Sequence, residues 1–162
     1  MSTNGNLMAA FAGESQANRK YTAFALVAEK EGHKDAARLF QATAEAENTH
    51  AVAELKLAGK LGDTKANLAA AIEGETYEFS TMYPEFEEEA KKEGQTSAEK
   101  AFVLAKEAEK VHAKLYKEAL DNLDKDTGVS YYLCPVCGYI EKGGAPDTCP
   151  ICKAKGSTFK KF

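Results

Sequence analysis

Residues 47–50 read Glu-Asn-Thr-His, and residues 109–112 read Glu-Lys-Val-His. The chain has three histidines, so two of the three follow a glutamate at the same spacing. Residues i and i+3 share one face of an α-helix, and each pair can therefore present a carboxylate and an imidazole to one metal ion. If both pairs lie in helices, the two stretches predict a helical bundle with a metal site in its core.

The first 128 residues have the composition of helix. Alanine, glutamate, lysine and leucine dominate them, and Pro84 is their only proline. Apolar residues recur at intervals of three and four, as on the buried stripe of an amphipathic helix. The predicted helices cover residues 7–31, 35–58, 66–93 and 97–123. The expected end signals are a glycine after each of the first three, Gly32, Gly59 and Gly94, and a capping box, Thr96 to Glu99, at the start of the fourth.

Four helices of about 25 residues, each about 38 Å long at 1.5 Å per residue, suit a four-helix bundle. The short links at Gly32 and Gly94 predict two antiparallel hairpins. The link over residues 59–65 is longer and permits a crossover, which would make the topology ferritin-like rather than up-down-up-down. We expect a mainly α fold, in which a ferritin-like four-helix bundle precedes a small C-terminal metal-knuckle domain.

A candidate carboxylate precedes each Glu-x-x-His pair by a similar interval. Glu14 lies 33 residues before Glu47, and Glu75 lies 34 residues before Glu109. Two matching half-bundles would surround one core with two glutamates and two Glu-x-x-His pairs, the pattern of di-iron and di-manganese carboxylate proteins. Carboxylates buried there need cations to balance their charge. With Glu78, which shares a helix face with Glu75, the candidate ligands are Glu14, Glu47, His50, Glu75, Glu78, Glu109 and His112.

Two tyrosines are candidates for hydrogen bonds to these carboxylates. Tyr21 follows Glu14 by two helical turns, and Tyr83 belongs to the third helix; a core tyrosine with another partner is the alternative for both. Carboxylate and imidazole ligands favour Fe or Mn over Cu, and Zn can also occupy them. We interpret His33 as a surface or hydrogen-bonded residue, and we interpret as solvated charges Glu85, Glu87, Glu88, Glu89 and Glu93.

The C-terminal end has a different composition. Residues 130–162 contain all four cysteines, three of the four prolines, five lysines and two acids, which gives a net charge near +3 against −7 for residues 1–129. Four thiolates bind Zn or Fe, and the spacing leaves a structural zinc site and a redox iron site both open. We predict two domains, residues 1–128 and 129–162. The cysteines form two Cys-x-x-Cys pairs, Cys134 with Cys137 and Cys149 with Cys152.

Composition excludes several classes of protein. No apolar run approaches the ~20 residues that span a bilayer, and the N-terminal residues lack the basic segment of a secretion signal. An acidic body without a basic stripe argues against nucleic acid as the main partner. We expect a cytoplasmic protein with no membrane partner, in which the thiolates bind metal rather than form disulfides.

Together these motifs resemble the rubrerythrin family along essentially the whole chain. Besides the two Glu-x-x-His pairs, the matches are Ala-Phe-Ala-Gly-Glu-Ser-Gln-Ala at 10–17, Gly-Glu-Thr-Tyr-Glu at 74–78, Met-Tyr-Pro at 82–84 and Cys-Pro-x-Cys-Gly-Tyr at 134–139. Tyr132 departs from the family, which often has tryptophan there, and no ligand depends on it.

The resemblance implies a ferritin-like di-iron bundle followed by a rubredoxin-like domain with a third iron. Zinc is a possible substitute at either site. The resemblance implies that Glu47 and Glu109 bridge the two irons of the bundle. It implies that Glu14 binds one of these irons, that Glu75 and His112 bind the other, and that Glu78 and His50 alternate as ligands of the first. The third iron would be bound by Cys134, Cys137, Cys149 and Cys152.

The resemblance also implies an activity, the reduction of hydrogen peroxide to water in oxidative-stress defence. The seven bundle ligands, Tyr21 and Tyr83 would be its catalytic residues. Electrons would come from a reduced pyridine nucleotide through a reductase or rubredoxin, and then through the cysteine-bound iron. A homodimer or higher homo-oligomer is expected, with the cysteine centre facing the other subunit's bundle. The alternative is a ferritin-like ferroxidase or iron-handling protein with a structural zinc tail.

Overall fold

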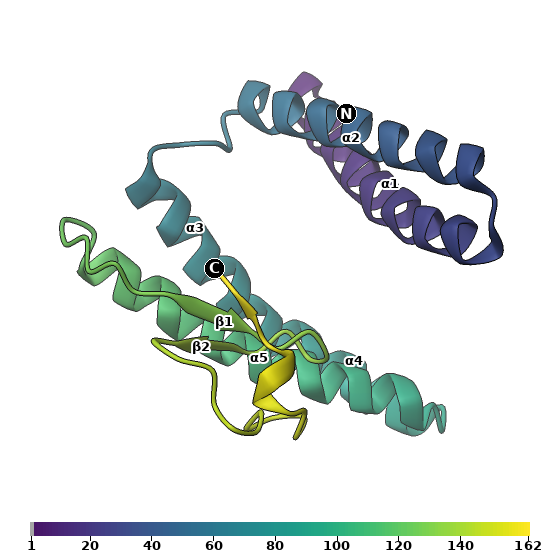
Figure 1. Ribbon diagram of the computed structural model, residues 1–162. Helices are drawn as coiled ribbons and strands as arrows, with labels where there is room; N and C mark the ends of the chain where they lie inside the picture. Colours follow the sequence, from purple (N-terminus) through teal and green to yellow (C-terminus); the bar gives the residue numbers. More distant parts are fainter. Residues whose placement is uncertain (1) are drawn as a thin grey trace. The chain divides into compact units, whose positions relative to one another are not determined.

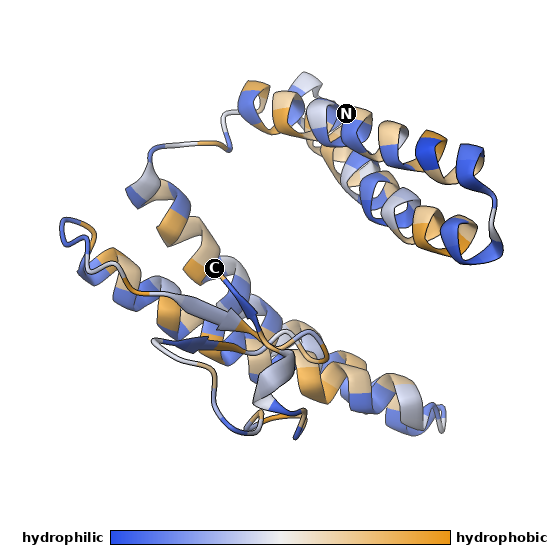
Figure 2. Cartoon of the chain, viewed as in Figure 1, coloured by the Kyte–Doolittle hydropathy of each residue, from blue (hydrophilic) through white to orange (hydrophobic). Residues whose placement is uncertain are grey.

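The computed structural model describes residues 2–162, most of which are helical (Figure 1). Its contacts divide the chain into two compact units, Met1–Gly62 and Asp63–Phe162. Each unit contains a helical hairpin, as the short links predict. Apolar and polar residues alternate along the helices (Figure 2). Within residues 2–162, no helix is both long and apolar enough to cross a membrane.

The first unit is a hairpin of α1 (Thr3–Glu31) and α2 (Lys34–Leu57). Its buried residues are alanines, whose small side chains let the two helices approach closely. The Asn18 side chain adds a hydrogen bond across the pair, to the Ala44 carbonyl at 2.7 Å. Gly32 ends α1 in the left-handed region, with φ 85°, so the predicted glycine stop is confirmed.

The second unit begins with another hairpin, in which α5 packs against two shorter helices that follow one another. These are α3 (Thr64–Tyr77) and α4 (Tyr83–Lys92), and α5 covers Thr96–Asp121. Between the short helices lies a π-helical turn, η1 (Glu78–Met82). The prediction of one regular helix over residues 66–93 is therefore wrong at its centre.

Pro84 explains the π-helical turn. Proline has no N–H, and its ring clashes with the carbonyl four residues earlier in a regular α-helix. The turn removes this conflict by widening the helix, and the Tyr83 N–H bonds to the Glu78 carbonyl, five residues back. The extra residue in the turn also changes which side chains share a face on either side of it.

The start of α5 also differs from the expected one. Gly94 turns the chain with φ 68°, and the Gln95 N–H closes α4 by bonding to the Ala90 carbonyl at 2.8 Å. The next helix begins immediately, and the Glu99 N–H bonds to the Gln95 carbonyl at 3.0 Å. Thr96 therefore lies inside α5, and the predicted capping box is wrong.

The tail is a small three-stranded antiparallel sheet with two cysteine loops. Strand β1 (Tyr131–Leu133) lies between β2 (Ile140–Lys142) and β3 (Lys160–Lys161). Its buried hydrophobic cluster consists of two cysteines and Tyr139, and Val111 of α5 packs against this cluster. The tail thus contacts α5 of its own chain. The predicted domain boundary after residue 128 stays a prediction.

Both units leave large apolar side chains exposed. In the first unit, Leu39 is 64% and Leu57 73% exposed, and in the second Tyr77 is 56% exposed. A surface of this kind on a hairpin of amphipathic helices is typical of a face that other helices cover. The predicted mainly α fold, with a small C-terminal domain that carries the four cysteines, is confirmed, and the crossover stays a prediction.

Candidate metal centres

The first unit brings three of the predicted ligands together. Glu14 of α1 and Glu47 and His50 of α2 each offer one ligand atom, and these atoms lie within 4.8 Å of one another. The His50 Nδ1 lies 3.1 Å from the Glu47 Oε2. A hydrogen bond with Glu47 raises the pKa of Glu14, because two carboxylates side by side share a proton when no cation balances them.

The second unit contains the matching group. Glu75 of α3 and Glu109 and His112 of α5 also offer ligand atoms within 4.8 Å of one another. The His112 Nδ1 lies 2.6 Å from Glu109 Oε2 and 3.6 Å from Glu75 Oε2. Burial, followed by a hydrogen bond with Glu109, raises the pKa of Glu75 to about 7.

One carboxylate oxygen of this second group, Glu75 Oε2, indicates that the group suits a bound cation. Glu75 Oε2 is buried, and within residues 2–162 it has no hydrogen-bond partner. A buried carboxylate oxygen without a donor costs free energy, and a bound cation removes that cost. The donor set of two carboxylates and one imidazole suits iron, manganese or zinc.

The raised pKa of Glu75 gives a test on the metal-free protein. Because the folded-state pKa of about 7 exceeds the ordinary 4.5, protonated Glu75 stabilises the fold fully below pH 4.5, and this stabilisation disappears as the pH rises through 7. We expect the Tm of the metal-free protein to fall over this interval and that of Glu75→Gln to fall less. Calorimetry at several pH values measures both. Equal slopes for the two proteins contradict the assignment.

Glu78 and Tyr83 lie beside this second group. Burial, then the negative charge of Glu109, raises the pKa of Glu78. Burial also raises the pKa of Tyr83, and the charges of Glu109, Glu78 and Glu75 raise it further. The Tyr83 hydroxyl is thus held in its protonated form near these carboxylates.

Tyr21 occupies the corresponding place in the first unit. Its ring packs with Phe24 and Phe40, each at 6.2 Å between centroids. Tyr83 packs with Phe86 and Phe102 at the same 6.2 Å. This packing fits the core-tyrosine alternative, and a hydrogen bond from Tyr21 to a ligand carboxylate stays a prediction.

The two units are an internal repeat, and the π-helical turn marks its one irregularity. After the turn, equivalent residues are 62 positions apart, whereas Gly13-Glu14 and Gly74-Glu75, which precede it, are 61 apart. The turn therefore accounts for the one-residue difference between the two Glu-to-Glu intervals, and Glu78 is its first residue. The pairs at 62 are Tyr21 and Tyr83, Phe24 and Phe86, Ala28 and Ala90, Gly32 and Gly94, Phe40 and Phe102, Glu47 and Glu109, His50 and His112, and Ala51 and Ala113.

The structure adds one carboxylate that the sequence analysis missed. Glu54 has a buried oxygen without a hydrogen-bond partner in residues 2–162, and its charge raises the pKa of Glu14. It follows Glu47 by two helical turns, so its spacing alone could have placed it on the ligand face.

Glu87 was expected to be solvated, and that prediction is wrong. Its carboxylate lies 2.6 Å from the Lys106 Nζ, and both side chains are only 20% exposed. The ion pair joins α4 to α5, a contact between residues 19 apart that no helical periodicity reveals.

The four cysteine sulfurs form a compact group. The Sγ atoms of Cys134 and Cys152 are 3.5 Å apart, and those of Cys137 and Cys149 are 3.6 Å apart. A tetrahedral metal with bonds of about 2.3 Å to sulfur requires separations of about 3.8 Å, so the group fits Zn or Fe.

Backbone N–H groups favour the thiolate form of one of these cysteines, Cys134. Burial raises the pKa of the Cys134 thiol, but hydrogen bonds from the backbone N–H groups of Cys137 and Val136 and from the side chains of Cys152 and Cys137 outweigh it and lower the pKa to about 7. Burial raises the pKa of the Cys137 and Cys152 thiols. Gly138 adopts φ 80°, a conformation that favours glycine, in the turn after the second cysteine. Thiolate is the metal-binding form, so the lowered pKa of Cys134 favours metal binding by this cysteine.

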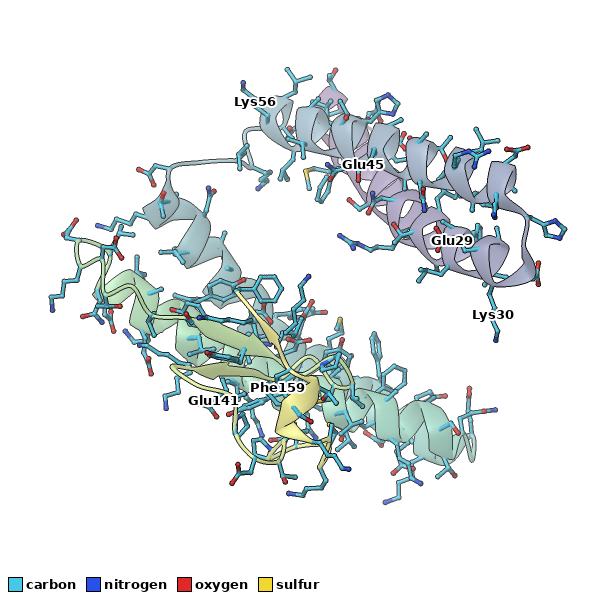
Figure 3. The ribbon with its side chains drawn as sticks, viewed as in Figure 1. Glu29, Lys30, Glu45, Lys56, Glu141 and Phe159 are labelled. Carbon is cyan, nitrogen blue, oxygen red and sulfur yellow. The ribbon has the colours of Figure 1, made fainter. Side chains whose placement is uncertain are left out.

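Tyr139 fixes the base of the cysteine loops. It is 8% exposed, donates a hydrogen bond to Glu141 and packs edge-on against Phe159 at 6.4 Å. Glu141 and Phe159 are marked in the tail in Figure 3. These contacts hold the first cysteine loop against the sheet.

One hydrogen bond joins the cysteine loops to the second carboxylate group. The His112 Nε2 lies 2.8 Å from the Gly138 carbonyl oxygen. A carbonyl can only accept, so Nε2 carries the hydrogen, and in the neutral ring Nδ1 keeps the lone pair that a metal needs. Histidine ligands of metals usually donate their second N–H in this way.

A largely apolar cleft leads to the second carboxylate group, at Glu75 and His112. Its volume is about 620 Å³, and Glu75 and His112 supply a carboxylate and an imidazole to its lining. Residues of α3, α5 and the tail form its walls, among them Leu115, Tyr131 and Phe162. The cleft gives small molecules a route to the second group.

The predicted ligands thus fall into three groups, one of three residues in each unit and one of four cysteines in the tail. Glu78 adjoins the group in the second unit. A joint site made by both carboxylate groups stays a prediction.

Comparisons with known proteins agree with this arrangement. Residues 5–120 match the family profile described as rubrerythrin, and residues 132–160 match the rubredoxin-like domain of rubrerythrin. Nigerythrin of Nitratidesulfovibrio vulgaris is 42% identical over 175 aligned positions, which cover 99% of this chain and 87% of that protein. Rubrerythrin-1 of Clostridium acetobutylicum is 38% identical, with 93% and 89% covered.

Among solved structures, nigerythrin in its fully reduced, all-ferrous state matches with a TM-score of 0.62 and 40% identity. The match covers all of this chain and 87% of that one. Sequence and fold agree along the whole length, so the chain belongs to the rubrerythrin family.

Proposed function

We propose that the protein is a peroxidase that reduces hydrogen peroxide to water, with electrons supplied through the cysteine centre. The reaction takes two electrons and two protons for each peroxide, and it yields two waters. The observation that carries the proposal is the position of His112, which contacts carboxylates at Nδ1 and the first cysteine loop at Nε2. A protein that only stored iron would have no need of this link.

The residues fit the family's cofactors, a di-iron site and one cysteine-bound iron. The two carboxylate groups, Glu47 and Glu109 among them, would hold the pair of irons, and the four cysteines would hold the third. When bound, the irons supply Lewis acidity and electrons at the peroxide. Glu78 and His50 are the residues proposed to alternate as ligands with oxidation state.

The protein's own groups position and protect this chemistry. The Tyr83 hydroxyl stays protonated and can donate a hydrogen bond toward the carboxylates, which fixes their orientation. His112 and Glu109 are partly buried, each 16% exposed, so the surrounding helices and tail limit how far these two side chains can move. The cleft beside Glu75 admits a molecule as small as peroxide.

The hydrogen bond from His112 to Gly138 gives electrons a short path from the cysteine centre to the second carboxylate group. From the sulfur of Cys137, the chain runs through one peptide bond to Gly138, and its carbonyl accepts the hydrogen bond from His112. A reductase or a separate rubredoxin is the proposed electron donor to the cysteine centre.

Metal analysis combined with a peroxidase assay tests the proposal. We expect iron at the cysteine centre and in the bundle, and peroxide-dependent oxidation of NADH when a suitable reductase is added. Zinc in the tail, together with iron oxidation that stops after one cycle, would instead support a ferroxidase with a structural tail. The colour of an Fe(Cys)4 centre distinguishes the two before any assay.

A further inference from the structure

The cleft beside the second carboxylate group is far larger than hydrogen peroxide requires. Its volume is about 620 Å³. One water molecule takes up about 30 Å³ in the liquid, and hydrogen peroxide has only one more oxygen atom, so it fills a small part of this space. Clefts of about 300–1,000 Å³ hold organic ligands in many proteins. The cleft therefore has room for a peroxide that carries an organic group.

The cleft has a polar end and an apolar remainder. On α5, its lining residues His112, Leu115 and Ala119 follow one another along one helix face. On α3, Leu68 lies seven residues before Glu75. The two helices are antiparallel neighbours (Figure 1), and Glu75 and His112 are level with each other, with 3.6 Å between Oε2 and Nδ1. Leu68 and Ala119 extend in the same direction from this pair, and both lie about 10 Å from it at 1.5 Å per residue.

The tail completes the wall of the cleft with apolar and aromatic residues. Leu133 of β1 and Ile140 of β2 belong to this part. So does Phe162, whose N–H bonds to the Tyr131 carbonyl at 2.8 Å and whose carbonyl accepts a bond from the Tyr131 N–H at 3.0 Å. Since Phe162 is also 63% exposed, it lies where the cleft opens to solvent. An organic group thus meets apolar side chains from the opening inward.

The second unit differs from the first at positions that line the cleft. Under the 62-residue repeat, Tyr116 corresponds to Glu54, and Ala119 corresponds to Leu57. Both Tyr116 and Ala119 line the cleft. A ring in place of a carboxylate makes the wall aromatic, and alanine in place of leucine leaves room beside it. These differences between the two repeats favour an apolar ligand in the second unit.

We propose that the cleft binds the organic group of an alkyl or aryl hydroperoxide, and that the protein reduces such hydroperoxides as well as hydrogen peroxide. The proposal rests on the proposed function, because it uses the same reducing site, and it adds a substrate class. The O–O bond of the hydroperoxide breaks, and two protons from solvent and two electrons complete the products, one alcohol and one water. The electrons come from the reduced bundle metals and are replaced through the cysteine centre.

An organic hydroperoxide matches both parts of the cleft. Its hydroperoxide group is polar and belongs beside Glu75 and His112, where the predicted metal ligands lie. Its organic group belongs along the apolar remainder. Each buried CH₂ group strengthens binding by about fourfold, so a larger apolar group should bind more tightly as long as the cleft holds it. Hydrogen peroxide has no apolar group and gains nothing from these walls.

A pair of organic hydroperoxides measures the effect of the apolar wall. tert-Butyl hydroperoxide and cumene hydroperoxide are both tertiary, and in the second a phenyl ring replaces one methyl group. With the iron-loaded protein, a reductase and NADH, we expect kcat/KM to be about tenfold higher for cumene hydroperoxide, because the ring adds buried apolar surface. Chromatography should find one cumyl alcohol for each NADH oxidised. A kcat/KM that is no higher for cumene hydroperoxide overturns the proposal.

Filling the cleft should separate the two kinds of peroxide. Ala119→Trp puts an indole ring among the apolar lining residues, away from the ligands at Glu75 and His112. We expect the ratio of kcat/KM for cumene hydroperoxide to that for hydrogen peroxide to fall by about tenfold. The matched control, Lys114→Trp, puts the same ring on α5 at a side chain that is 76% exposed, and it should keep the wild-type ratio. An unchanged ratio in Ala119→Trp, with its helices shown by circular dichroism, overturns the proposal.

Binding to the metal-free protein is measured without any turnover. The probe is cumyl alcohol, which carries the organic group and has no O–O bond to reduce. In NMR spectra of the methyl-labelled protein, we expect saturable shifts for Leu115 and Ile140, which line the cleft, and none for the exposed Leu39 of the first unit. Ala119→Trp should lose these shifts, and Lys114→Trp should keep them. The absence of saturable shifts at the cleft, or equal shifts at Leu39, overturns the proposal.

These measurements distinguish the substrate class from the proposed function. Turnover of hydrogen peroxide without binding of cumyl alcohol overturns the substrate class alone. Binding of cumyl alcohol without turnover of any peroxide overturns the proposed function, and with it the reduction of organic hydroperoxides, whereas the assignment of the cleft to an apolar group stands.

Discussion

Glu109→Ala should lose bundle iron and reduce peroxide turnover by more than about 100-fold, since even outer partners of metal ligands are worth 10–100-fold. Glu109 contacts His112 at 2.6 Å and shares a hydrogen bond with Glu75. Its removal therefore takes away one ligand and the contacts that orient the other two ligands of the second unit. The cysteine centre contains none of these residues, and its visible spectrum should be unchanged. Iron analysis and steady-state kinetics measure the two effects.

Glu107→Ala is the matched control for this change. Glu107 lies on the same helix, 41% exposed, and pairs with Lys110 at 2.9 Å on the surface. An exposed pair of this kind contributes little to stability, so iron content and turnover should stay at the wild-type level. Full activity in Glu109→Ala contradicts the bridging role.

Cys134→Ser should abolish steady-state turnover and leave a single turnover intact. Cys134 is fully buried at the centre of the tail, and its loss removes one of four thiolates from the metal. The chemically reduced variant still contains the bundle ligands, so it should consume peroxide once and then stop for want of electrons. Stopped-flow mixing measures the first event, and the NADH-linked assay measures the second.

Val136→Ala is the control in the same loop. Its side chain is 64% exposed, and the loop uses its backbone N–H rather than its side chain. Wild-type turnover is expected. If Cys134→Ser continues to turn over with the reductase, electrons reach the bundle without the cysteine centre and the relay is wrong.

Local signals in the sequence predicted most of the helices and the cysteine site. Gly32 and Gly94 both end helices with positive φ, as their positions after the apolar stripes indicate. The two Cys-x-x-Cys pairs likewise predict a closed group of four sulfurs, because each pair turns within four residues and only the distance between pairs depends on the fold.

The sequence contains a signal for the π-helical turn that the prediction of a regular helix does not use. The two Glu-to-Glu intervals differ by one residue, and Pro84 follows the place where the extra residue lies. A regular helix was the simpler interpretation, since glutamate, alanine and lysine, which are good helix formers, dominate residues 85–92.

Contacts between distant segments could not be predicted. The bond from His112 to Gly138 joins residues 26 apart on a helix and a loop, and the pair of Glu87 with Lys106 joins two helices. Such contacts depend on how elements pack, which periodicity within one element does not determine.

The order of oxidation in one stopped-flow experiment tests the central claim most directly. The protein is fully reduced without oxygen and mixed with an excess of peroxide, and the visible bands of the bundle irons and of the cysteine-bound iron are followed together. We predict that the bundle is oxidised first and that the cysteine-bound iron follows as it returns electrons. A cysteine centre that stays unchanged while peroxide persists, or that is oxidised before the bundle, contradicts the proposed peroxidase.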